Sequence, residues 1–259
     1  MQSICTEKNP SCWRFSGCRP QLFCSTSGQI TGTGNLSIGT AATLHLANNT
    51  PVSTTASLSL TNTSFLDLTN AKLIVEDTSV TRPADLTLLK SQVSSSNIYS
   101  ATANAFNTTA GKTVMVVAIS DNAIREATFP SGSTNFGATN NVDTHSILIT
   151  ATYKGDANLD GVVDIQDLTD VANHWQQAVT DWSQGDFDNS NFVDIQDLTA
   201  IANNWQDGVG AGGGSSQSFS DALTQIGGLS APTPAPEPNS FALLSLTSLL
   251  LTKPRRHHI

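Results

Sequence analysis

Short alternating apolar runs, separated by Asn, Gly and Thr, dominate the chain between residues 26 and 154. Apolar residues two positions apart place their side chains on one face of a strand. The pairs that do so are Leu44/Leu46, Leu58/Leu60, Leu66/Leu68 and Leu73/Val75. Successive pairs lie close enough along the chain for hairpins or for the coils of a small solenoid. We therefore expect residues 26–154 to be mainly β, as a short-strand solenoid or a sandwich.

Longer apolar patterns follow in the same region. Residues 112–120, KTVMVVAIS, form a continuous apolar run suited to a buried strand. Residues 145–153, HSILITATY, alternate apolar and polar positions as a strand does. In residues 83–93, Leu86, Leu89 and Val93 recur at helical spacing. These patterns predict two further strands and one short helix.

A different pattern occupies residues 155–206, where one segment is repeated thirty residues further on. The segments 155–176 and 185–206 agree at more than half of their positions, including the whole of VDIQDLT. In each copy, apolar residues recur at helical spacing after an acidic stretch. They are Ile165, Leu168, Ala172 and Trp175 in the first copy and Ile195, Leu198, Ala202 and Trp205 in the second. Each acidic stretch is thus predicted to lead into one helix.

The acidic stretch of each copy has the ligand spacing of a twelve-residue calcium loop, with ligands at positions 1, 3, 5, 7, 9 and 12. The first loop offers Asp156, Asn158, Asp160, the carbonyl of Val162, Asp164 and Asp167. The second offers Asp186, Asp188, Ser190, the carbonyl of Phe192, Asp194 and Asp197. Gly161 stands at position 6 of the first loop, where the chain turns sharply, and Asn191 replaces it in the second. Because Ser190 is a neutral ligand, we expect the second site to bind more weakly.

Only oxygen ligands are offered, which favours calcium over zinc or copper, and a flexible twelve-residue loop favours calcium over magnesium. Carboxylates crowded without a cation repel one another, so we expect two Ca²⁺ ions to supply folding energy here. We also expect Val163 and Val193, both at loop position 8, to pair as a short β-bridge between the loops. The helices are expected to pack together around Trp175 and Trp205. A surface role for these two aromatics, in sugar or partner binding, is the alternative.

The loops GDANLDGVVDIQDLT and GDFDNSNFVDIQDLT, with Asp at position 12 and a strand-like segment before the first, resemble a type I dockerin domain. The resemblance covers residues 155 to about 207. It implies an all-α module with two calcium ions that docks onto a cohesin or a similar surface protein. Members of this family commonly attach polysaccharide-degrading enzymes to a scaffold. Where cellulosomal dockerins carry a pair of small hydroxyl residues after position 9, this chain has Ile165–Gln166 and Ile195–Gln196.

The tail of the chain changes from a polar, Gly-, Ser- and Pro-rich stretch to an apolar run with a basic end. Residues 210–238 are rich in Gly, Ser and Pro, which predicts a flexible and then semi-extended linker. Residues 236–238 (Pro-Glu-Pro), the apolar run in 239–251 and the basic residues Lys253, Arg255 and Arg256 resemble a PEP-CTERM signal. That resemblance implies export to the envelope of Gram-negative bacteria and cleavage by an exosortase-type enzyme. A membrane-associated or packed helix is the alternative, since the run is too short to span a bilayer comfortably.

The start of the chain holds all four cysteines, Cys5, Cys12, Cys18 and Cys24, and no C-x-x-C pair. Two disulfides with three possible connectivities, or a poorly structured leader over residues 1–25, are both open. Charged residues interrupt this segment, so no apolar signal sequence is visible. Because the tail indicates export, we interpret this start as a piece of a longer gene product.

The net charge and the motifs of the chain limit the classes of function that it can have. The chain of 259 residues carries a net charge of −9, which disfavours nucleic acid as a partner, and 8 of its 21 acidic residues lie in the two loops. A glycoside hydrolase would need two facing carboxylates. The carboxylates in the β-rich region are Asp67, Glu76, Asp77, Asp85, Asp121, Glu126 and Asp143, and none stands in a catalytic motif. His45 and His145 have no Ser or Cys partner in the sequence pattern.

We therefore expect a non-catalytic, exported surface or interaction protein with five parts. These are a leader (1–25), a β-rich domain (26–154), a dockerin-like domain (155–209), a linker (210–238) and a sorting helix with a basic tail (239–259). The Thr/Asn/Gly-rich leucine ladders of residues 28–75 resemble the β-strand repeat regions of autotransporter-like surface proteins. The alternative is a component of polysaccharide degradation, docked through the dockerin-like domain.

Overall fold

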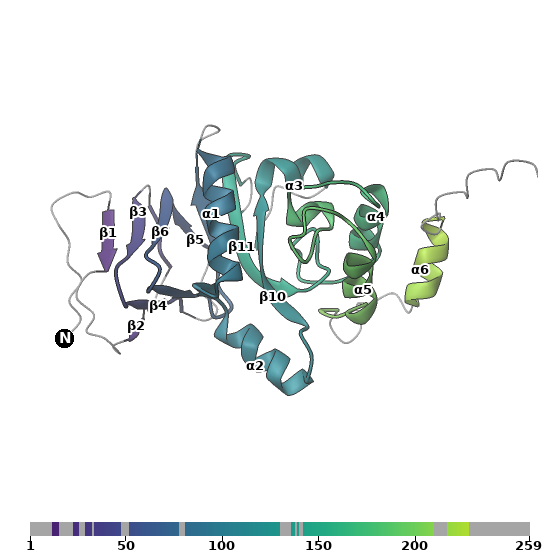
Figure 1. The fold of residues 1–259 in the computed structure, drawn as a ribbon, viewed down its shortest axis with the longest axis horizontal. Helices are drawn as coiled ribbons and strands as arrows, with labels where there is room; N and C mark the ends of the chain where they lie inside the picture. Colours follow the sequence, from purple (N-terminus) through teal and green to yellow (C-terminus); the bar gives the residue numbers. More distant parts are fainter. Residues whose placement is uncertain are drawn as a thin grey trace, which may run out of the picture.

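The computed structural model describes residues 12–15, 23–25, 29–32, 34–47, 52–77, 81–129, 136–137, 139, 142–209 and 217–227. Figure 1 shows parallel coils of short strands at one end, a sheet with long strands in the middle and a pair of helices beyond it. We call the described residues between 29 and 153 the body, and residues 155–209 the loop–helix module.

The first part of the body winds as stacked coils of three strands. One coil consists of β3 (Asn35–Ile38), β4 (Thr43–His45) and β5 (Ser53–Thr55). The next consists of β6 (Ser57–Leu60), β7 (Phe65–Asp67) and β8 (Lys72–Glu76). Each strand pairs in parallel with the equivalent strand of the next coil, for example Asn35 with Ser57 and Thr43 with Phe65. Parallel stacking of this kind is that of a solenoid and not of a sandwich.

The coils stack because their apolar pairs point inward. Leu36, Ile38, Leu44, Leu46, Leu58, Leu66, Leu68, Leu73 and Val75 are buried in one core, and Leu60 packs against it. Two short strands precede these coils, β1 (Cys12–Phe15) on β3 and β2 (Phe23–Ser25) on β4, both parallel. They lie within the predicted leader, and the rest of that segment falls outside the described residues.

A four-stranded sheet lies between the coils and the module and packs against both. Its order is β10 (Met115–Asp121), β11 (Ser146–Tyr153), β8 and β5, with β10 and β11 antiparallel. Alternate side chains point to opposite faces. Ile147 and Ile149 enter the core of the coils, whereas Leu148 and Ala118 enter a second core shared with the module. Burial on both faces explains the continuous apolar run in residues 112–120.

Helices make the body a mixed α/β structure, so the expectation of a mainly β region holds only in part. The predicted helix is present as α1 (Arg82–Ser94), followed by β9 (Ile98–Tyr99), which pairs with β7. Two further helices, α2 (Ala101–Ala110) and α3 (Asn122–Thr128), were not predicted. Both begin at a side-chain cap: Ser100 accepts from Ala103 N–H, and Asp121 accepts from Ala123 N–H.

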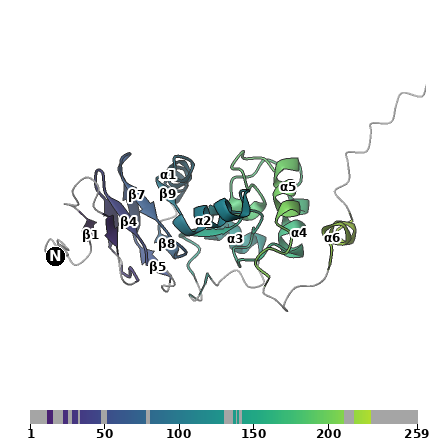
Figure 2. The same cartoon turned by 90° about the horizontal axis from the view of Figure 1, so that it is seen from below.

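The loop–helix module contains α4 (Ile165–Asn173), the 3₁₀ turn η1 (Trp182–Gln184) and α5 (Ile195–Asn203). The two views agree that it lies on the side of β10 and β11 away from the coils (Figures 1 and 2). Within the described part of the chain, no helix has the length and apolar character needed to cross a membrane.

Part of the predicted linker is helical, which corrects the expectation for residues 210–238. Helix α6 (Phe219–Gln225) starts at Ser218, whose hydroxyl accepts from Asp221 N–H at 3.1 Å. Trp205 anchors it, because its Nε1 donates to the Gln217 carbonyl at 2.9 Å and its ring meets Phe219 edge-on. The predicted sorting tail lies outside the described residues.

Candidate metal centre

The two acidic loops have the same backbone conformation, although their middle residues differ. Non-glycine residues with positive φ occur at equivalent places, Leu159 at 62° and Asn189 at 59°. At loop position 6, Gly161 has φ 92° and Asn191 has φ 63°. Asparagine thus adopts in the second loop the left-handed conformation that the first gives to glycine.

Backbone N–H groups point inward to the same carboxylates in both loops. Asp156, at position 1, accepts from Asp160 N–H and Gly161 N–H at 3.1 and 2.9 Å. Asp186 accepts from Ser190 N–H and Asn191 N–H at 2.9 and 3.0 Å. Each loop therefore curls around its first carboxylate.

The position-12 carboxylates close the curl from the helix side. Asp167 accepts from Ala157 N–H and Asp164 N–H, at 2.8 and 2.9 Å. Asp197 accepts from Phe187 N–H and Asp194 N–H, at 2.7 and 3.0 Å. Asp164 and Asp194 in turn cap their helices, which completes a capping box at the start of α4 and of α5. Local hydrogen bonding thus fixes positions 1, 9 and 12 in both loops.

The second loop gathers three carboxylates in a group that could hold a metal ion. Ligand oxygens of Asp186, Asp188 and Asp197 lie within 4.8 Å of one another, and within the described ranges these are the residues that gather so. Oxygens bound to one calcium ion at about 2.3–2.6 Å lie at most about 5 Å apart, so the group fits that ion. Of the other predicted ligands, Ser190 Oγ donates to the Phe192 carbonyl at 2.9 Å, and Asp194 caps α5.

The first loop holds its predicted ligands in a tighter internal network. Asp156 and Asp167 are fully buried, while Asp160 is exposed. The Asn158 amide donates to Asp160 Oδ2 at 2.9 Å, and Val162 N–H donates to Asp160 Oδ1 at 2.9 Å. These bonds hold Asn158 and Asp160 to each other, and Asp164 is engaged as the cap of α4.

Crowding and burial shift the acidity of both loops. Burial raises the pKa of Asp156 to about 7, against the hydrogen bond from Thr152, and the charge of Asp160 raises it further. Burial raises the pKa of Asp197 to about 6, against the N–H groups of Asp194 and Phe187. Since burial is the largest cause of both shifts, Asp156 and Asp197 are desolvated carboxylates, whose ionised form a nearby cation would stabilise.

The predicted bridge between Val163 and Val193 is wrong. Val163 donates to the Asp207 carbonyl at 3.0 Å and accepts from Gln206 N–H at 2.8 Å. Val193 donates to the Gln177 carbonyl and accepts from Gln176 N–H, both at 3.0 Å. Each loop therefore pairs with the turn that follows the other loop's helix. This exchange joins the two copies.

The predicted apolar helix faces are partly wrong. Leu168 is buried as expected, but Ile195 is 62% exposed and Ala202 is also exposed. Val171 and Ile201, which the periodicity missed, are fully buried at equivalent positions of α4 and α5. The helices turn the face carrying these residues, rather than the one carrying Ile195, towards the core.

The main aromatic anchor is Trp182, which lies between the two copies and belongs to neither helix. It is 2% exposed, donates from Nε1 to the Asp156 carbonyl at 2.7 Å and meets the Phe187 ring edge-on at 5.1 Å. Trp175 and Trp205 are partly buried against the same core, so the core role expected for them holds in part. Trp182 has no periodic partner in the sequence, and this explains why the repeat pattern does not reveal it.

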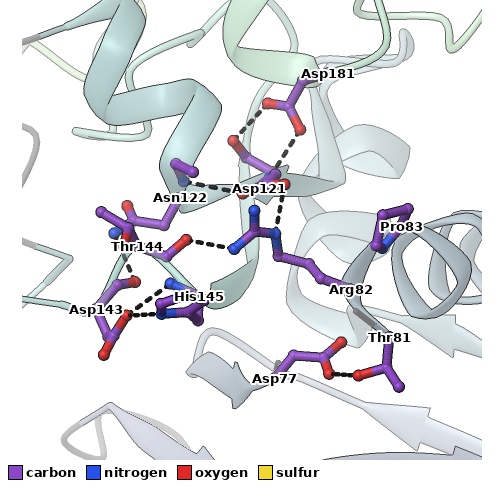
Figure 3. A network of polar contacts seen from close by, with 12 residues as sticks. Asp77, Thr81, Arg82, Pro83, Asp121, Asn122, Asp143, Thr144, His145 and Asp181 are labelled. Atoms are coloured by element: carbon purple, nitrogen blue, oxygen red, sulfur yellow. Dashed lines mark hydrogen bonds and ion pairs between the residues drawn. The ribbon is translucent and has the colours of Figure 1, made fainter. Parts of the chain in front are cut away.

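A polar network connects the module to the body at Asp181 (Figure 3). This buried carboxylate accepts from Ser120 Oγ at 2.6 Å and from Asp121 N–H at 2.7 Å. Asp121 pairs with Arg82 Nε at 2.8 Å. Arg82 also donates to the Thr144 carbonyl at 2.8 Å. The strand β10, the helix α1 and the module are thereby fixed to one another.

The carboxylates of the body have structural contacts. Asp67 pairs with His45 at 2.7 Å and accepts from the N–H groups of Thr69 and Ala101. Asp143 pairs with His145 at 2.8 Å. Glu76 accepts from Ser146, Glu126 accepts from Asn122, Asp77 accepts from Thr81, and Asp85 lies beside Asp77. Each of these carboxylates therefore has a polar neighbour within the body.

Comparison of the chain with known protein families, curated proteins and solved structures gave no match.

Proposed function

We propose that residues 155–209 form a calcium-binding docking module of the dockerin kind, within a non-catalytic exported surface protein. The observation that carries this proposal is the repetition, thirty residues apart, of one curled acidic loop with the same inward hydrogen bonds and the same capped helix. A solvated acidic linker has no reason to repeat such a geometry.

The ion proposed is Ca²⁺, one in each loop. The donors are carboxylates, an amide, a hydroxyl and backbone carbonyls, which are the hard oxygen ligands that calcium prefers. The first ion would be held by Asp156, Asn158, Asp160, Val162, Asp164 and Asp167. The second would be held by Asp186, Asp188, Ser190, Phe192, Asp194 and Asp197. The bound ion supplies positive charge between carboxylates that otherwise repel each other.

Docking is supported by apolar side chains that remain exposed beside the second loop. Ile195 is 62% exposed and Phe192 is 40% exposed, and Gln196 beside them is also exposed. Because Ile195 and Gln196 stand where cellulosomal dockerins have hydroxyl residues, the proposed partner is a cohesin-like surface protein with an apolar contact face. Export, and cleavage by an exosortase-type enzyme, are proposed from the sequence of residues 236–256.

Calorimetric titration of the full chain with Ca²⁺ tests the proposal. We expect two binding events in the unaltered protein, and the loss of one of them in the Asp156→Ala variant. Asp143→Ala is the matched control, because it removes an exposed carboxylate outside the loops. An unaltered protein that binds no calcium would refute the proposal. Two undiminished events in the Asp156→Ala variant would refute the assignment of Asp156 as a ligand.

A further inference from the structure

Two cationic side chains of the body reach the backbone of the first loop. Arg125 of α3 is 4% exposed, and its Nε donates to the Asn158 carbonyl at 2.8 Å. Lys72 of β8 lies with Nζ at 3.5 Å from the Leu159 carbonyl and 4.6 Å from the centre of the Phe136 ring. Asn158 and Leu159 stand at loop positions 3 and 4. The first loop is therefore seated on two positive charges that belong to another part of the fold.

Both loops contain carboxylates of their own, but the charged side chains of the body that act on the first loop are cations. Lys72 and Arg125 both interact with the charges of Asp156 and Asp160. The charge that acts on Asp186 is that of Asp188 in the same loop. The charges that act on Asp197 are those of Asp188 and Asp186. A metal ion entering the first loop thus meets two cations of the body in addition to the loop's own carboxylates, whereas Asp186 and Asp197 are acted on by carboxylates of their own loop.

The two loops also differ in how closely their carboxylates are gathered. The second loop already gathers Asp186, Asp188 and Asp197, with Asp188 exposed to solvent. In the first loop, all of which the structure describes, the Asn158 amide donates to Asp160 Oδ2 at 2.9 Å, and the loop's carboxylates are not gathered in this way. Positive charge held close to a site lowers its affinity for another cation, by an amount that falls with distance and screening.

We propose that the two loops are unequal calcium sites, the second being the tighter, and that Lys72 and Arg125 hold down the affinity of the first. The inference rests on the proposed calcium function and reverses the order expected from Ser190. The first ion would then lie at the contact between the module and the body, because Lys72 and Arg125 of the body hold the loop that would bind it.

Calorimetric titration of the full chain tests this order of affinities with variants of two exposed carboxylates, one in each loop. We expect the unaltered protein to show two events whose affinities differ on the order of 10-fold. Asp188→Ala should abolish the tighter event, and Asp160→Ala should abolish the weaker one, because alanine offers no side-chain oxygen at either position. The opposite assignment, or two events of equal affinity, would overturn the inference. Absence of any calcium binding in the unaltered protein would instead refute the proposed function.

The role of Lys72 is tested by Lys72→Met, which removes the charge but keeps an unbranched apolar side chain beside Phe136. We expect the affinity of the weaker event to rise on the order of 10-fold. Lys112→Met is the matched control: it changes the net charge equally, and Lys112 contacts the module at the Asn203 carbonyl, 2.8 Å away and outside both loops. Equal affinities in the two variants would overturn the role of Lys72. Should Lys72→Met not fold, the two carboxylate variants still decide which site is tighter.

Discussion

Gly185, the residue before the second loop, lies directly against Val171 of helix α4. A Cβ atom on Gly185 would stand 2.8 Å from Val171 Cγ2 and 3.3 Å from its Cα. The first loop repeats the contact, since a Cβ on Gly155 would stand 3.2 Å from the Cα of Ile201 in α5. Each loop is therefore led by a glycine that packs on the helix of the other loop, and the two copies are interlocked as one packed unit.

The first prediction concerns this close approach. Gly185 has φ +91°, so Gly185→Ala adds both backbone strain and a clash with Val171. We expect the free energy of unfolding to fall by about 2–4 kcal/mol. Gly161→Ala is the matched control, because Gly161 has φ +92° but open space around it, and should cost about 1 kcal/mol. Urea denaturation in the presence of a calcium chelator measures both, and equal losses would contradict the proposed contact.

The parts of the site that depend on local spacing could be predicted from the sequence, and the parts that depend on contacts between copies could not. Asp156 and Asp167 lie eleven positions apart in one loop, so a sequence pattern is enough to relate them. The pairing of Val163 with Gln206 joins residues more than forty positions apart, and no local signal specifies it. The bridge expected between Val163 and Val193 failed for this reason.

Prediction of the fold from the sequence was limited in the same way, because local patterns were informative and long-range contacts were not. The apolar pairs around Leu44 and Leu66 predicted strands correctly, because alternation is a local property of a half-buried strand. Helix α2, whose sequence ATANAFNTTA has only Ala103 buried, carries almost no amphipathic pattern. Its start is visible only in the cap at Ser100. The burial of Lys72 and Arg125 beside the first loop depends on tertiary packing and could not be anticipated.

The second prediction concerns Asp181, the carboxylate that links the module to β10. It accepts from Ser120, from Asp121 N–H and from both the N–H and the hydroxyl of Ser183. Asp181→Ala leaves these buried donors without an acceptor, and we expect a loss of about 3 kcal/mol in the free energy of unfolding. Ser183→Ala, which removes a single donor hydroxyl, should cost about 1 kcal/mol. Equal stability of Asp181→Ala and the unaltered protein in chemical denaturation would show that the link is not stabilising.

The third prediction concerns removal of calcium. A ligand that binds only the folded state stabilises it by about 4 kcal/mol at a thousandfold excess over its dissociation constant. For a folded unit of this size, that corresponds to a fall of about 10 °C in melting temperature when the ion is chelated. Because the module shares its core with Leu148 and Ala118 of the body, we expect both parts to melt in one transition. Scanning calorimetry with calcium, with magnesium and with a chelator measures this, and identical curves in all three would contradict it.

The fourth prediction concerns Asp170 on α4 and His174, the residue that caps the end of that helix; neither belongs to the proposed ligands. His174 Nδ1 lies 3.1 Å from Asp170 Oδ1, and this hydrogen bond raises the pKa of His174 above its usual 6.5. The pKa of Asp170 is raised by its burial, which the hydrogen bond with His174 opposes, while the charge of Asp181 adds to the rise. A raised histidine pKa contributes stability that is fully present below the unfolded value and is lost as the pH rises through the folded value.

His174→Gln should therefore cost more stability at about pH 5.5 than at about pH 8.5, because only the protonated imidazole gains from the carboxylate. Chemical denaturation at the two pH values measures the difference. An NMR titration of the His174 ring should give a midpoint above 6.5, and Asp170→Asn should lower that midpoint by removing the group that holds the proton. A midpoint at or below 6.5 in the unaltered protein would mean that burial outweighs the hydrogen bond, and the pH dependence of His174→Gln would then reverse.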